Sequence, residues 1–533
     1  MEMENIFPVT KHLSQQLLQY PFFLSVILLF LSLLLLFTSK NKSRSPHGEV
    51  LKLPPSPRRF PIIGNLHQLG RFPHHSLRAL SEKYGPIMLL HMGHSPTLVI
   101  SSADLVKEIV KKHDVVFSNR PKSTASDLLF YGGKDIAFAP YGTYWKQARK
   151  ICILHLLSPK RVQESFLLVM KEEVSALVDR IQKEIASPES GISINLSHVL
   201  RLTTKYMVTR CILGRYEEQG GGSRLVELGR RMMIQLRAFS FGDFFPSLKW
   251  LDRARGYIGS LKSTSRELDA FYNQVIEEHK ARMESGGQIS NSIDFVDILL
   301  QLQKDPSSID FELSDEHVKA IIQDMLFAGI DTTSTATEWL VAELLRNPRV
   351  MTKVQEEIRR VVGEKATVDV EDINRMDYFK CVVKENLRLH PPVPLNVPRE
   401  TSESLEIGGY HVPAKTSVLV NAWAIHRNPD FWESPEEFIP ERFENNSVDF
   451  IKSQEYFQLI PFGFGRRHCP GMTLGFLMIE YLVANLLFWF DWKLHNTGDS
   501  DHALPEDLDM SEVFAITAFK KSPIHAFPKK YSP

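Results

Sequence analysis

One cysteine stands in a segment rich in turn-forming and basic residues. Residues 461–471 read PFGFGRRHCPG, in which Arg466 and Arg467 precede His468 and Cys469. Glycine and proline at this density predict a rigid turn rather than a helix or a strand. The backbone N–H groups of such a turn can bond a thiolate, and the two arginines would lower the pKa of the Cys469 thiol. A free cysteine in a tight loop remains the alternative, whereas a zinc site is disfavoured because no second cysteine lies nearby.

A second candidate for chemistry lies in residues 328–333, which read AGIDTT. These residues fall in the middle of a long helical pattern, although glycine costs about 1 kcal/mol in a helix interior and β-branched threonines are poor helix formers. A helix that is weak only at its centre indicates a local function. Small residues let a flat ligand approach the backbone, and a hydroxyl beside a carboxylate can relay protons. The alternative is an ordinary kinked helix whose threonine bonds the carbonyl four residues earlier.

The elements that would position these residues are mostly helical. Residues 102–386 show helical periodicity with few interruptions. The helix that carries AGIDTT should begin after an N-cap at Ser314 and end near Asn347, before Pro348. Strand patterns are confined to residues 96–101 and 416–422. The sequence therefore predicts a mainly helical domain with a smaller β-containing part drawn from early and late sequence.

Composition narrows the class of protein. The 533 residues include 63 Lys and Arg against 63 Asp and Glu, so the formal net charge is zero, which excludes the strong basic character of a nucleic-acid binder. The chain is 43% hydrophobic and 24% charged, as folded globular proteins are. The cysteines are Cys152, Cys211, Cys381 and Cys469, with no CxxC pair, which excludes a disulfide scaffold and fits a reducing compartment.

The amino terminus has the pattern of a membrane anchor. Residues 20–37 contain no charge and, with their apolar neighbours, are about long enough to span a bilayer core. A cleaved signal peptide is the alternative, but no small-residue cleavage site follows the run. Lys40, Lys42 and Arg44 follow it and favour a cytoplasmic downstream domain. Residues 45–64 are rich in proline, which predicts a stiff hinge.

The cysteine segment resembles the haem-binding loop of cytochrome P-450 monooxygenases. Phe462, Gly465, Arg467, Cys469 and Gly471 fit the family pattern F-x-x-G-x-R-x-C-x-G. Four further matches follow the family's order along the chain: W-x-x-x-R at Trp145 and Arg149, A-G-x-D-T-T at residues 328–333, E-x-x-R at Glu385 and Arg388, and P-E-R-F at residues 440–443. The wording of KENLRLHPP at residues 384–392 and FGFGRRHCPG at residues 462–471 resembles the plant microsomal A-type enzymes in particular.

The resemblance implies a fold and a location. It implies the cytochrome P-450 fold, mainly α with a smaller β-containing subdomain, preceded by one N-terminal transmembrane helix. Residues 1–44 would form the membrane anchor and its basic flank, residues 45–64 the hinge, and residues 65–533 the haem-binding monooxygenase domain. The protein would be a single-pass protein of the endoplasmic reticulum membrane, with its catalytic domain facing the cytosol.

The resemblance also assigns residues to haem b. Cys469 would be the axial thiolate ligand of the iron, which favours O–O cleavage. Phe462 would shield the sulfur, and Gly465 and Gly471 would let the turn close against the porphyrin. The remaining candidates are the propionate partners Arg467, Arg149, Arg399 and Trp145, and the small residues Ala328 and Gly329 of the long helix.

Two further groups of residues follow from the same resemblance. Asp331 and Thr332 would be catalytic and would deliver protons at the haem. Glu385, Arg388 and Arg442 would form a buried ion network that supports the cysteine loop without taking part in catalysis.

The expected activity is an NADPH-dependent monooxygenation. The sequence has no dinucleotide motif after a strand, so electrons would come through NADPH-cytochrome P-450 reductase, with cytochrome b5 as a further partner. The substrates would be O2 and a hydrophobic plant metabolite of terpenoid, phenylpropanoid, coumarin or alkaloid type. Two alternatives remain: a reductase-independent haem-thiolate isomerase or dehydratase, and a non-catalytic membrane haem protein. Family position places the substrate pocket near Ala328 and in residues 126–132, 239–245, 393–396 and 514–517.

Overall fold

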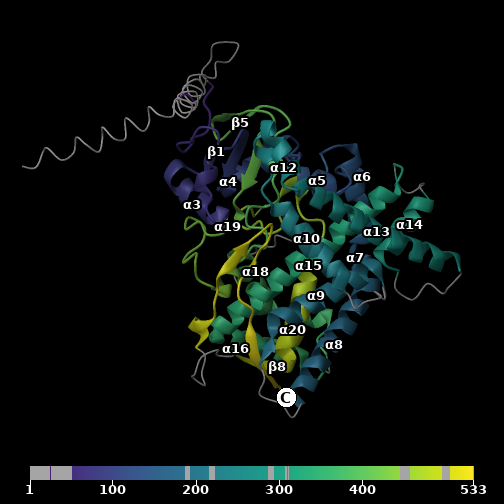
Figure 1. The fold of residues 1–533 in the computed structure, drawn as a ribbon. Coiled ribbons are helices and arrows are strands. Elements are labelled where there is room, and N and C mark those ends of the chain that lie inside the picture. Colours follow the sequence, from purple (N-terminus) through teal and green to yellow (C-terminus); the bar gives the residue numbers. More distant parts are fainter. Residues whose placement is uncertain are drawn as a thin grey trace, which may run out of the picture.

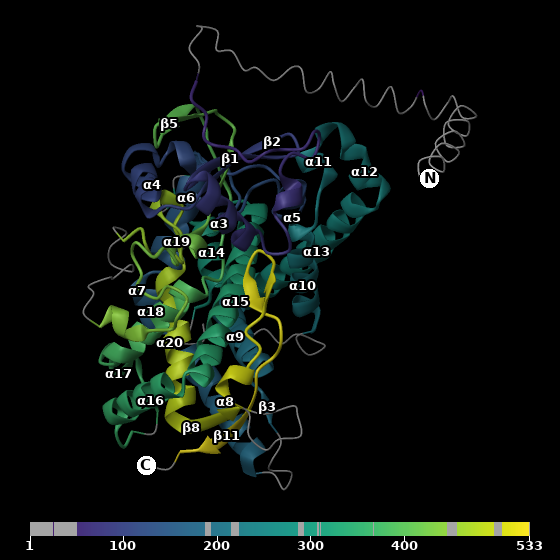
Figure 2. The same cartoon turned by 90° about the vertical axis from the view of Figure 1, so that its left-hand side faces the viewer.

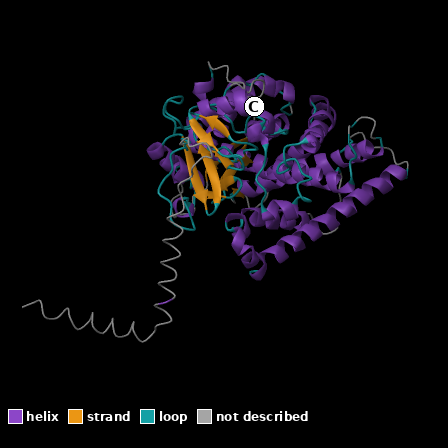
Figure 3. Ribbon diagram, turned by 90° about the horizontal axis from the view of Figure 1, so that it is seen from above, coloured by secondary structure: helices purple, strands orange, loops and turns teal. Residues whose placement is uncertain are grey.

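The computed structural model describes most of the chain beyond the predicted anchor. The described residues are 25, 51–186, 193–214, 223–285, 293–305, 309, 311–365, 367–444, 456–494 and 504–531. The anchor predicted for residues 20–37 lies outside these residues except for Ser25. Within them, helices fill most of the molecule and the strands gather toward one side (Figure 3).

The helices follow the predicted pattern. Their bounds are α3 Pro73–Tyr84, α4 Ala103–Glu108, α5 Thr124–Leu129, α6 Thr143–Ile151, α7 Pro159–Arg161, α8 Leu167–Ala186, α9 Leu196–Leu213, α10 Ser223–Arg237, α11 Phe241–Phe244, α12 Lys249–Ala254, α13 Tyr257–Glu284, α14 Phe295–Lys304, α15 Asp315–Arg346, α16 Pro348–Val362, α17 Val370–Asn374, α18 Asp377–Leu389, α19 Ala422–Ile425 and α20 Met472–Trp489. Short helical turns include η3 Val116–Ser118, η8 Pro440–Phe443 and η9 Gly465–Arg467.

Helix α15 runs through the middle of the molecule (Figure 1) and packs against α9, α18 and α20. Its start is confirmed at Ser314, whose side chain accepts the backbone N–H of His317 in a capping box. Its end is confirmed at Arg346, because Pro348 opens the next helix. The weak centre does not interrupt it. Thr332 Oγ1 donates to the carbonyl of Ala328 at 2.7 Å, which is the bond expected of a threonine in an ordinary helix.

Helix α20 follows the cysteine loop and lies beside α15. Among the described residues, α20 is the one helix long and apolar enough to cross a membrane. Two thirds of it, 67%, is buried inside the fold, which is the environment of a core helix. Its burial brings the residues just before it, including the cysteine, against the centre of α15.

The strands form small sheets. Their bounds are β1 Ile87–Met92, β2 Ser95–Ile100, β3 Ile194–Asn195, β4 Arg399–Glu400, β5 Leu405–Ile407, β6 Tyr410–Val412, β7 Ser417–Val420, β8 Phe490–Leu494, β9 Glu512–Phe514, β10 Ala518–Lys520 and β11 His525–Lys530. One sheet has the order β1-β2-β7-β4 and another the order β3-β11-β8, while β5–β6 and β9–β10 are hairpins.

The predicted union of early and late sequence is confirmed in the four-stranded sheet. Strand β2 pairs in parallel with β7, in a register that places Ile100 opposite Val420. This sheet and the three-stranded sheet lie at opposite ends of the molecule, with β1 and β2 at the top of Figure 2 and β8 and β11 at the bottom. The hairpin β9–β10 extends along α15 between them (Figure 2). The fold therefore encloses α15 between helices, the cysteine loop and this hairpin.

Candidate active site

A buried cavity of about 280 Å³ lies between the centre of α15, the start of α20 and the cysteine loop. Most of its wall is apolar, and its charged lining groups are concentrated on one side. The lining includes Val208, Ile212, Phe295, Met325, Leu387 and Met478 among apolar residues, and Arg120, Arg149, Asp324, Arg399 and Arg467 among charged ones. A mostly apolar cavity with a few convergent polar groups is the usual form of a small-molecule site.

Cys469 reaches this cavity at the end of a tightly wound loop. Gly463 and Gly465 have positive φ angles of 75° and 59°, a conformation that glycine adopts without strain. A Cβ atom at Gly465 would also stand 2.5 Å from the Asp114 carboxylate. The backbone N–H of Cys469 donates to the carbonyl of Phe462 at 2.8 Å, which closes the loop. The predicted rigid turn is therefore present, with Cys469 and Phe462 both on the cavity wall.

The surroundings of the Cys469 thiol differ from expectation in one respect. Burial raises the pKa of Cys469, while the backbone N–H of Gly471 and the guanidinium of Arg149 oppose that rise. Neither Arg466 nor Arg467 contributes, contrary to the sequence prediction. The backbone N–H and the side chain of Arg466 engage Asp114, and that side chain is 54% exposed. Arg149 is the arginine that acts on the thiol instead. Its guanidinium donates to the carbonyl of His468, the residue before Cys469, at 2.8 Å.

Arg467 turns the other way and joins two further buried arginines at the cavity. Its guanidinium donates to backbone carbonyls that include that of Ser118 at 2.7 Å. Burial, together with repulsion from Arg120 and Arg399, lowers the pKa of Arg467 to about 8. The Nη1 atom of Arg399 is buried and has no hydrogen-bond partner among the described residues. Three buried cations close together favour an anionic ligand.

Trp145 and Arg149 share one face of α6, as their spacing predicts, and both line the cavity. The Trp145 ring lies beneath the guanidinium of Arg467, with 4.1 Å between the guanidinium carbon and the ring centroid. Its indole N–H donates to the carbonyl of Ile136 at 3.1 Å. In this structure Trp145 thus supports Arg467 through its ring, while its N–H is engaged by the backbone.

The centre of α15 faces the cavity with small and hydroxylic side chains. Ala328, Gly329, Thr332 and Thr333 all line the cavity. A Cβ atom at Gly329 would come within 3.1 Å of Val208 on α9, so glycine at this position also allows the two helices to pack closely.

Asp331 does not line the cavity among the described residues; it lies behind this wall. One of its carboxylate oxygens accepts a hydrogen bond from the Thr517 hydroxyl at 2.6 Å. Burial raises the pKa of Asp331. The hydrogen bond from Thr517 and the charge of the nearby Arg201 only partly oppose that rise. Thr332 thus lines the cavity, whereas the carboxylate of its neighbour Asp331 is directed toward hairpin β9–β10.

Glu385, Arg388 and Arg442 lie together behind the cavity. The Arg388 guanidinium donates to both oxygens of Glu385 at 2.7 and 2.8 Å, and Arg442 Nε donates to Glu385 Oε1 at 3.0 Å. Glu385 and Arg388 are completely buried. Arg388 also donates to the carbonyls of His426 and Pro435. The network thus joins α18 to the loop that precedes the cysteine segment.

Sequence reasoning missed some residues of this site and misplaced others. Arg120, which donates to the carbonyls of Val397 and Pro398, carries no motif, although an arginine between asparagine and proline could have been noted. Of the segments expected to form the substrate pocket, residues 393–396 and the groove at Ala328 reach the cavity. Among the described residues, the other three do not line it: 126–132, 239–245 and 514–517.

Comparison with known proteins identifies the family to which the chain belongs. The model of the cytochrome P450 family matches residues 54–511. The chain belongs to the cytochrome P450 family. It is 52% identical to a phenylacetaldehyde oxime monooxygenase of Prunus mume, over 95% of each chain, and 48% identical to a cytochrome P450 of Persea americana, over 88% of this chain and 91% of the relative. A zebra fish cytochrome P450 solved with progesterone is 26% identical and superposes with a TM-score of 0.72, covering 86% of this chain and 99% of that one.

The chain is therefore a haem-thiolate monooxygenase with the P450 fold, and its cavity fits the cofactor of the family. Haem presents two anionic propionates and an iron that accepts a thiolate. The cavity offers the Cys469 sulfur on its wall, the buried arginines Arg120, Arg399 and Arg467, and an unpartnered Nη1 on Arg399. The donor set and the charge both match this group.

Proposed function

We propose that the chain is a reductase-dependent P450 that oxidises a hydrophobic plant metabolite at a membrane. The observation that supports this most is the opposition, across one cavity, of Cys469 on the loop and Thr332 on α15, with the arginine cluster at the side. Haem held there with a thiolate ligand would supply the activation of O2 and the transfer of one oxygen atom to the substrate. The chain's own residues bind the haem, orient the substrate and deliver protons.

The proposed roles divide among the described residues. Cys469 holds the iron, with Phe462 beside the sulfur and Gly465 and Gly471 shaping the loop. The propionates are held by Arg467, Arg399 and Arg149, with Trp145 supporting Arg467 through its ring.

Proton delivery is assigned to Thr332, whose hydroxyl lines the cavity, and to Asp331 behind it. Burial raises the pKa of Asp331, which suits a group that must hold a proton before giving it up. Arg388, Glu385 and Arg442 hold the cysteine loop in position from behind.

The substrate is inferred to be small and apolar. Val208, Phe295, Met325 and Leu387 are among the apolar residues that line the cavity beside the α15 groove. The relative from Prunus mume is named for an oxime of this size and character. Terpenoid, phenylpropanoid, coumarin and alkaloid compounds meet the same requirement. Electrons come from NADPH through a separate reductase, with cytochrome b5 as a further donor, and residues 20–37 anchor the enzyme in the endoplasmic reticulum.

The experiment compares microsomes that contain the full chain with and without added plant reductase. Panels of terpenoid, phenylpropanoid and alkaloid compounds are incubated with NADPH under ¹⁸O2. We expect a product that gains one labelled oxygen atom only when reductase and NADPH are both present. A product that forms equally without reductase would instead identify a haem-thiolate isomerase or dehydratase.

A further inference from the structure

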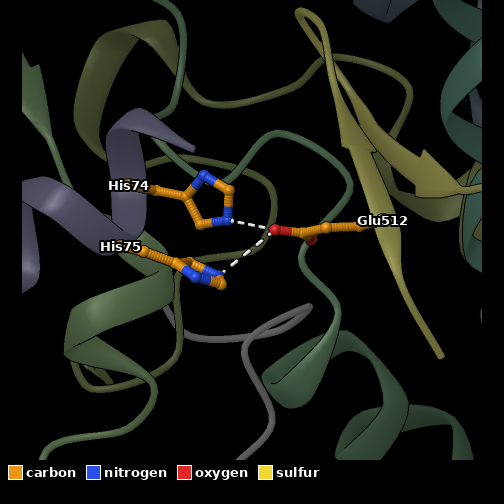
Figure 4. A group of neighbouring side chains, drawn as sticks. All are labelled: His74, His75 and Glu512. Carbon is orange, nitrogen blue, oxygen red and sulfur yellow. Dashed lines mark ion pairs between the residues drawn. The ribbon is translucent and has the colours of Figure 1, made fainter. Parts of the chain in front are cut away.

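Two histidines and a glutamate meet far from the cavity, where α3 contacts the hairpin β9–β10. His74 and His75 belong to the first turn of α3, and Glu512 opens β9. Figure 4 shows the three side chains converging on one point. The Nε2 atoms of His74 and His75 lie 2.8 and 3.2 Å from the same atom, Glu512 Oε1. Two elements from opposite ends of the chain thus present three ligand-type atoms to one place.

The cluster is held rigidly but remains accessible. His74 is completely buried, and its backbone carbonyl accepts the side-chain N–H of Asn421 at 2.8 Å. The His74 ring stacks on Phe514 with 5.2 Å between centroids, and the His75 ring stacks on Trp423 with 4.3 Å. The side chain of His75 is 46% exposed, so solvent and small ions reach it.

Hydrogen bonding leaves this cluster incompletely satisfied. Although 2.8 Å separates His74 Nε2 from Glu512 Oε1, neither ring nitrogen of His74 forms a well-aligned hydrogen bond among the described residues. Buried polar atoms are nearly always satisfied, so those that are not usually indicate a ligand or an ordered water. No lysine or arginine in the described part of the chain forms an ion pair with Glu512.

A second cluster of similar composition differs from this one in how its carboxylates are neutralised. His279, Asp294 and Asp297 also bring their ligand atoms together, and all three are buried. There, however, the Arg282 guanidinium lies 3.2 Å from Asp294 and 2.8 Å from Asp297. A cation from the chain itself already neutralises those carboxylates. Among the described residues, the charged partners that act on Glu512 are the imidazoles of His74 and His75, while Arg427 acts on His74.

We propose that His74, His75 and Glu512 bind a divalent transition-metal ion of the zinc type. Zinc binds imidazole nitrogen and carboxylate oxygen at about 2.0–2.2 Å, which in tetrahedral geometry places ligands of one ion about 3.3–3.6 Å apart. The observed separations of 2.8 and 3.2 Å lie below this range, so the Glu512 carboxylate must move away from the two imidazoles by a few tenths of an ångström to admit the ion. Two imidazoles favour zinc over magnesium or calcium, which prefer oxygen ligands. Water completes the coordination on the exposed side of His75.

Such an ion would fasten the start of the domain to the hairpin beside the active site. The hairpin carries Thr517, which bonds Asp331, and the carbonyl of Ala518, which accepts the indole N–H of Trp339 on α15 at 2.9 Å. Ion binding at its base therefore stabilises the junction between α3, the hairpin and α15. The site is independent of electron supply and of the metabolite oxidised.

The test measures zinc directly on the haem-loaded full chain in detergent. The chain is treated with a chelator, dialysed and titrated with Zn²⁺, and bound zinc is counted by elemental analysis while the Tm is recorded. His75→Ala and Glu512→Gln remove one ligand each, and His67→Ala is the control because that exposed histidine also stacks on an aromatic ring, Phe60. The ferrous CO spectrum checks that each variant retains its folded haem centre.

We expect one more zinc ion per chain in wild type and His67→Ala than in the two ligand variants, with a rise in Tm that the ligand variants lack. Loss of a direct ligand should weaken binding by more than the 10–100-fold typical of an outer-shell partner. Equal zinc content and equal Tm response in wild type, His75→Ala and Glu512→Gln would overturn the proposal. So would a wild-type chain that binds no zinc at micromolar concentration while its CO spectrum is intact.

Discussion

At the scale of single residues, neighbours of the same type take different roles because the backbone aims them differently. Arg466 and Arg467 are adjacent in η9, yet Arg466 pairs with Asp114 near the surface and Arg467 is buried at the cavity. The motif marks Arg467, but no local rule gives the direction of a side chain in a short 3₁₀ turn. Thr517 is a clearer limit, because its bond to Asp331 joins residues 186 positions apart.

The first prediction concerns the iron ligand. Cys469→Ser should abolish the red-shifted Soret band of the ferrous CO complex, because a serine hydroxyl does not supply a thiolate. Cys381→Ser is the control: Cys381 is also buried, but it lies on α18 and does not line the cavity. An unchanged band in Cys469→Ser, or its loss in Cys381→Ser instead, would show that the ligand has been wrongly assigned.

The second prediction concerns proton delivery. Thr332→Ala removes a hydroxyl that lines the cavity and bonds the Ala328 carbonyl. Folding should be almost unchanged, because alanine is the better helix former by up to about 0.7 kcal/mol. Product formed per NADPH should fall about tenfold or more, with peroxide in its place, because positioned proton donors contribute 10²–10⁴-fold. The measurement is NADPH consumed, peroxide and product in one reaction.

Thr333→Ala is the matched control for that experiment. Thr333 also lines the cavity, but it is buried, and its Oγ1 lies on the side of α15 that faces Gly475 of α20. Its removal should disturb coupling much less. The assignment fails if the ranking of the two threonines is reversed.

At the scale of elements, the two central helices were accessible to prediction to different degrees. The bounds of α15 follow from Ser314 and Pro348, because caps and proline act locally. Helix α20 is as apolar as a membrane span, and only its burial in the structure distinguishes it from one. It also carries a buried acid, Glu480, that no sequence pattern would place in a core.

The third prediction follows from that acid. Burial raises the pKa of Glu480 to about 8, although Lys380 and Lys384 partly oppose it. Between pH 4.5 and 8 the folded chain holds a proton that the unfolded chain has released, so the free energy of unfolding falls as pH rises. Glu480→Gln removes this dependence and should stabilise the protein at pH 8.5 by up to about 4 kcal/mol, with little effect at pH 5.

The measurement is thermal or urea unfolding at the two pH values, followed by circular dichroism. Glu356→Gln on the exposed face of α16 serves as the control, and its stability should track wild type at both values. If Glu480→Gln matches wild type at pH 8.5, the buried acid does not carry the expected penalty.

At the scale of the whole molecule, the mainly helical fold with small sheets agrees with the sequence prediction, but its assembly could not be predicted. Residues 96–101 and 416–422 read as strands because their patterns are local. The parallel pairing of Thr97 with Ser417 joins them across most of the chain, and no local signal specifies that register. The arginine cluster could not be predicted for the same reason, because Arg120, Arg399 and Arg467 come from three segments that are distant in sequence.

The fourth prediction concerns the anchor. Deleting residues 1–39 should release much of the protein from membranes and leave the haem chromophore intact, because the uncharged run at 20–37 is removed and the described fold begins beyond it. The measurement is the distribution between pellet and supernatant after alkaline extraction, with the full chain treated in parallel. Complete retention of the truncated chain in the pellet would indicate that another segment spans the membrane.

The hairpin β9–β10 acts on the active site indirectly: among the described residues it does not line the cavity, but its Thr517 bonds Asp331 behind the cavity wall. Its tip contacts α15 through Thr517 and Ala518, and the carbonyl of Phe514 accepts a bond from Arg237 of α10. Exchanging residues 511–521 between relatives would therefore shift the support of Asp331, and would replace Glu512, without changing a residue of the cavity wall. Natural variation in this segment should change the coupling of the reaction before it changes which compounds fit, whereas variation at the start of α20 changes the cavity wall directly.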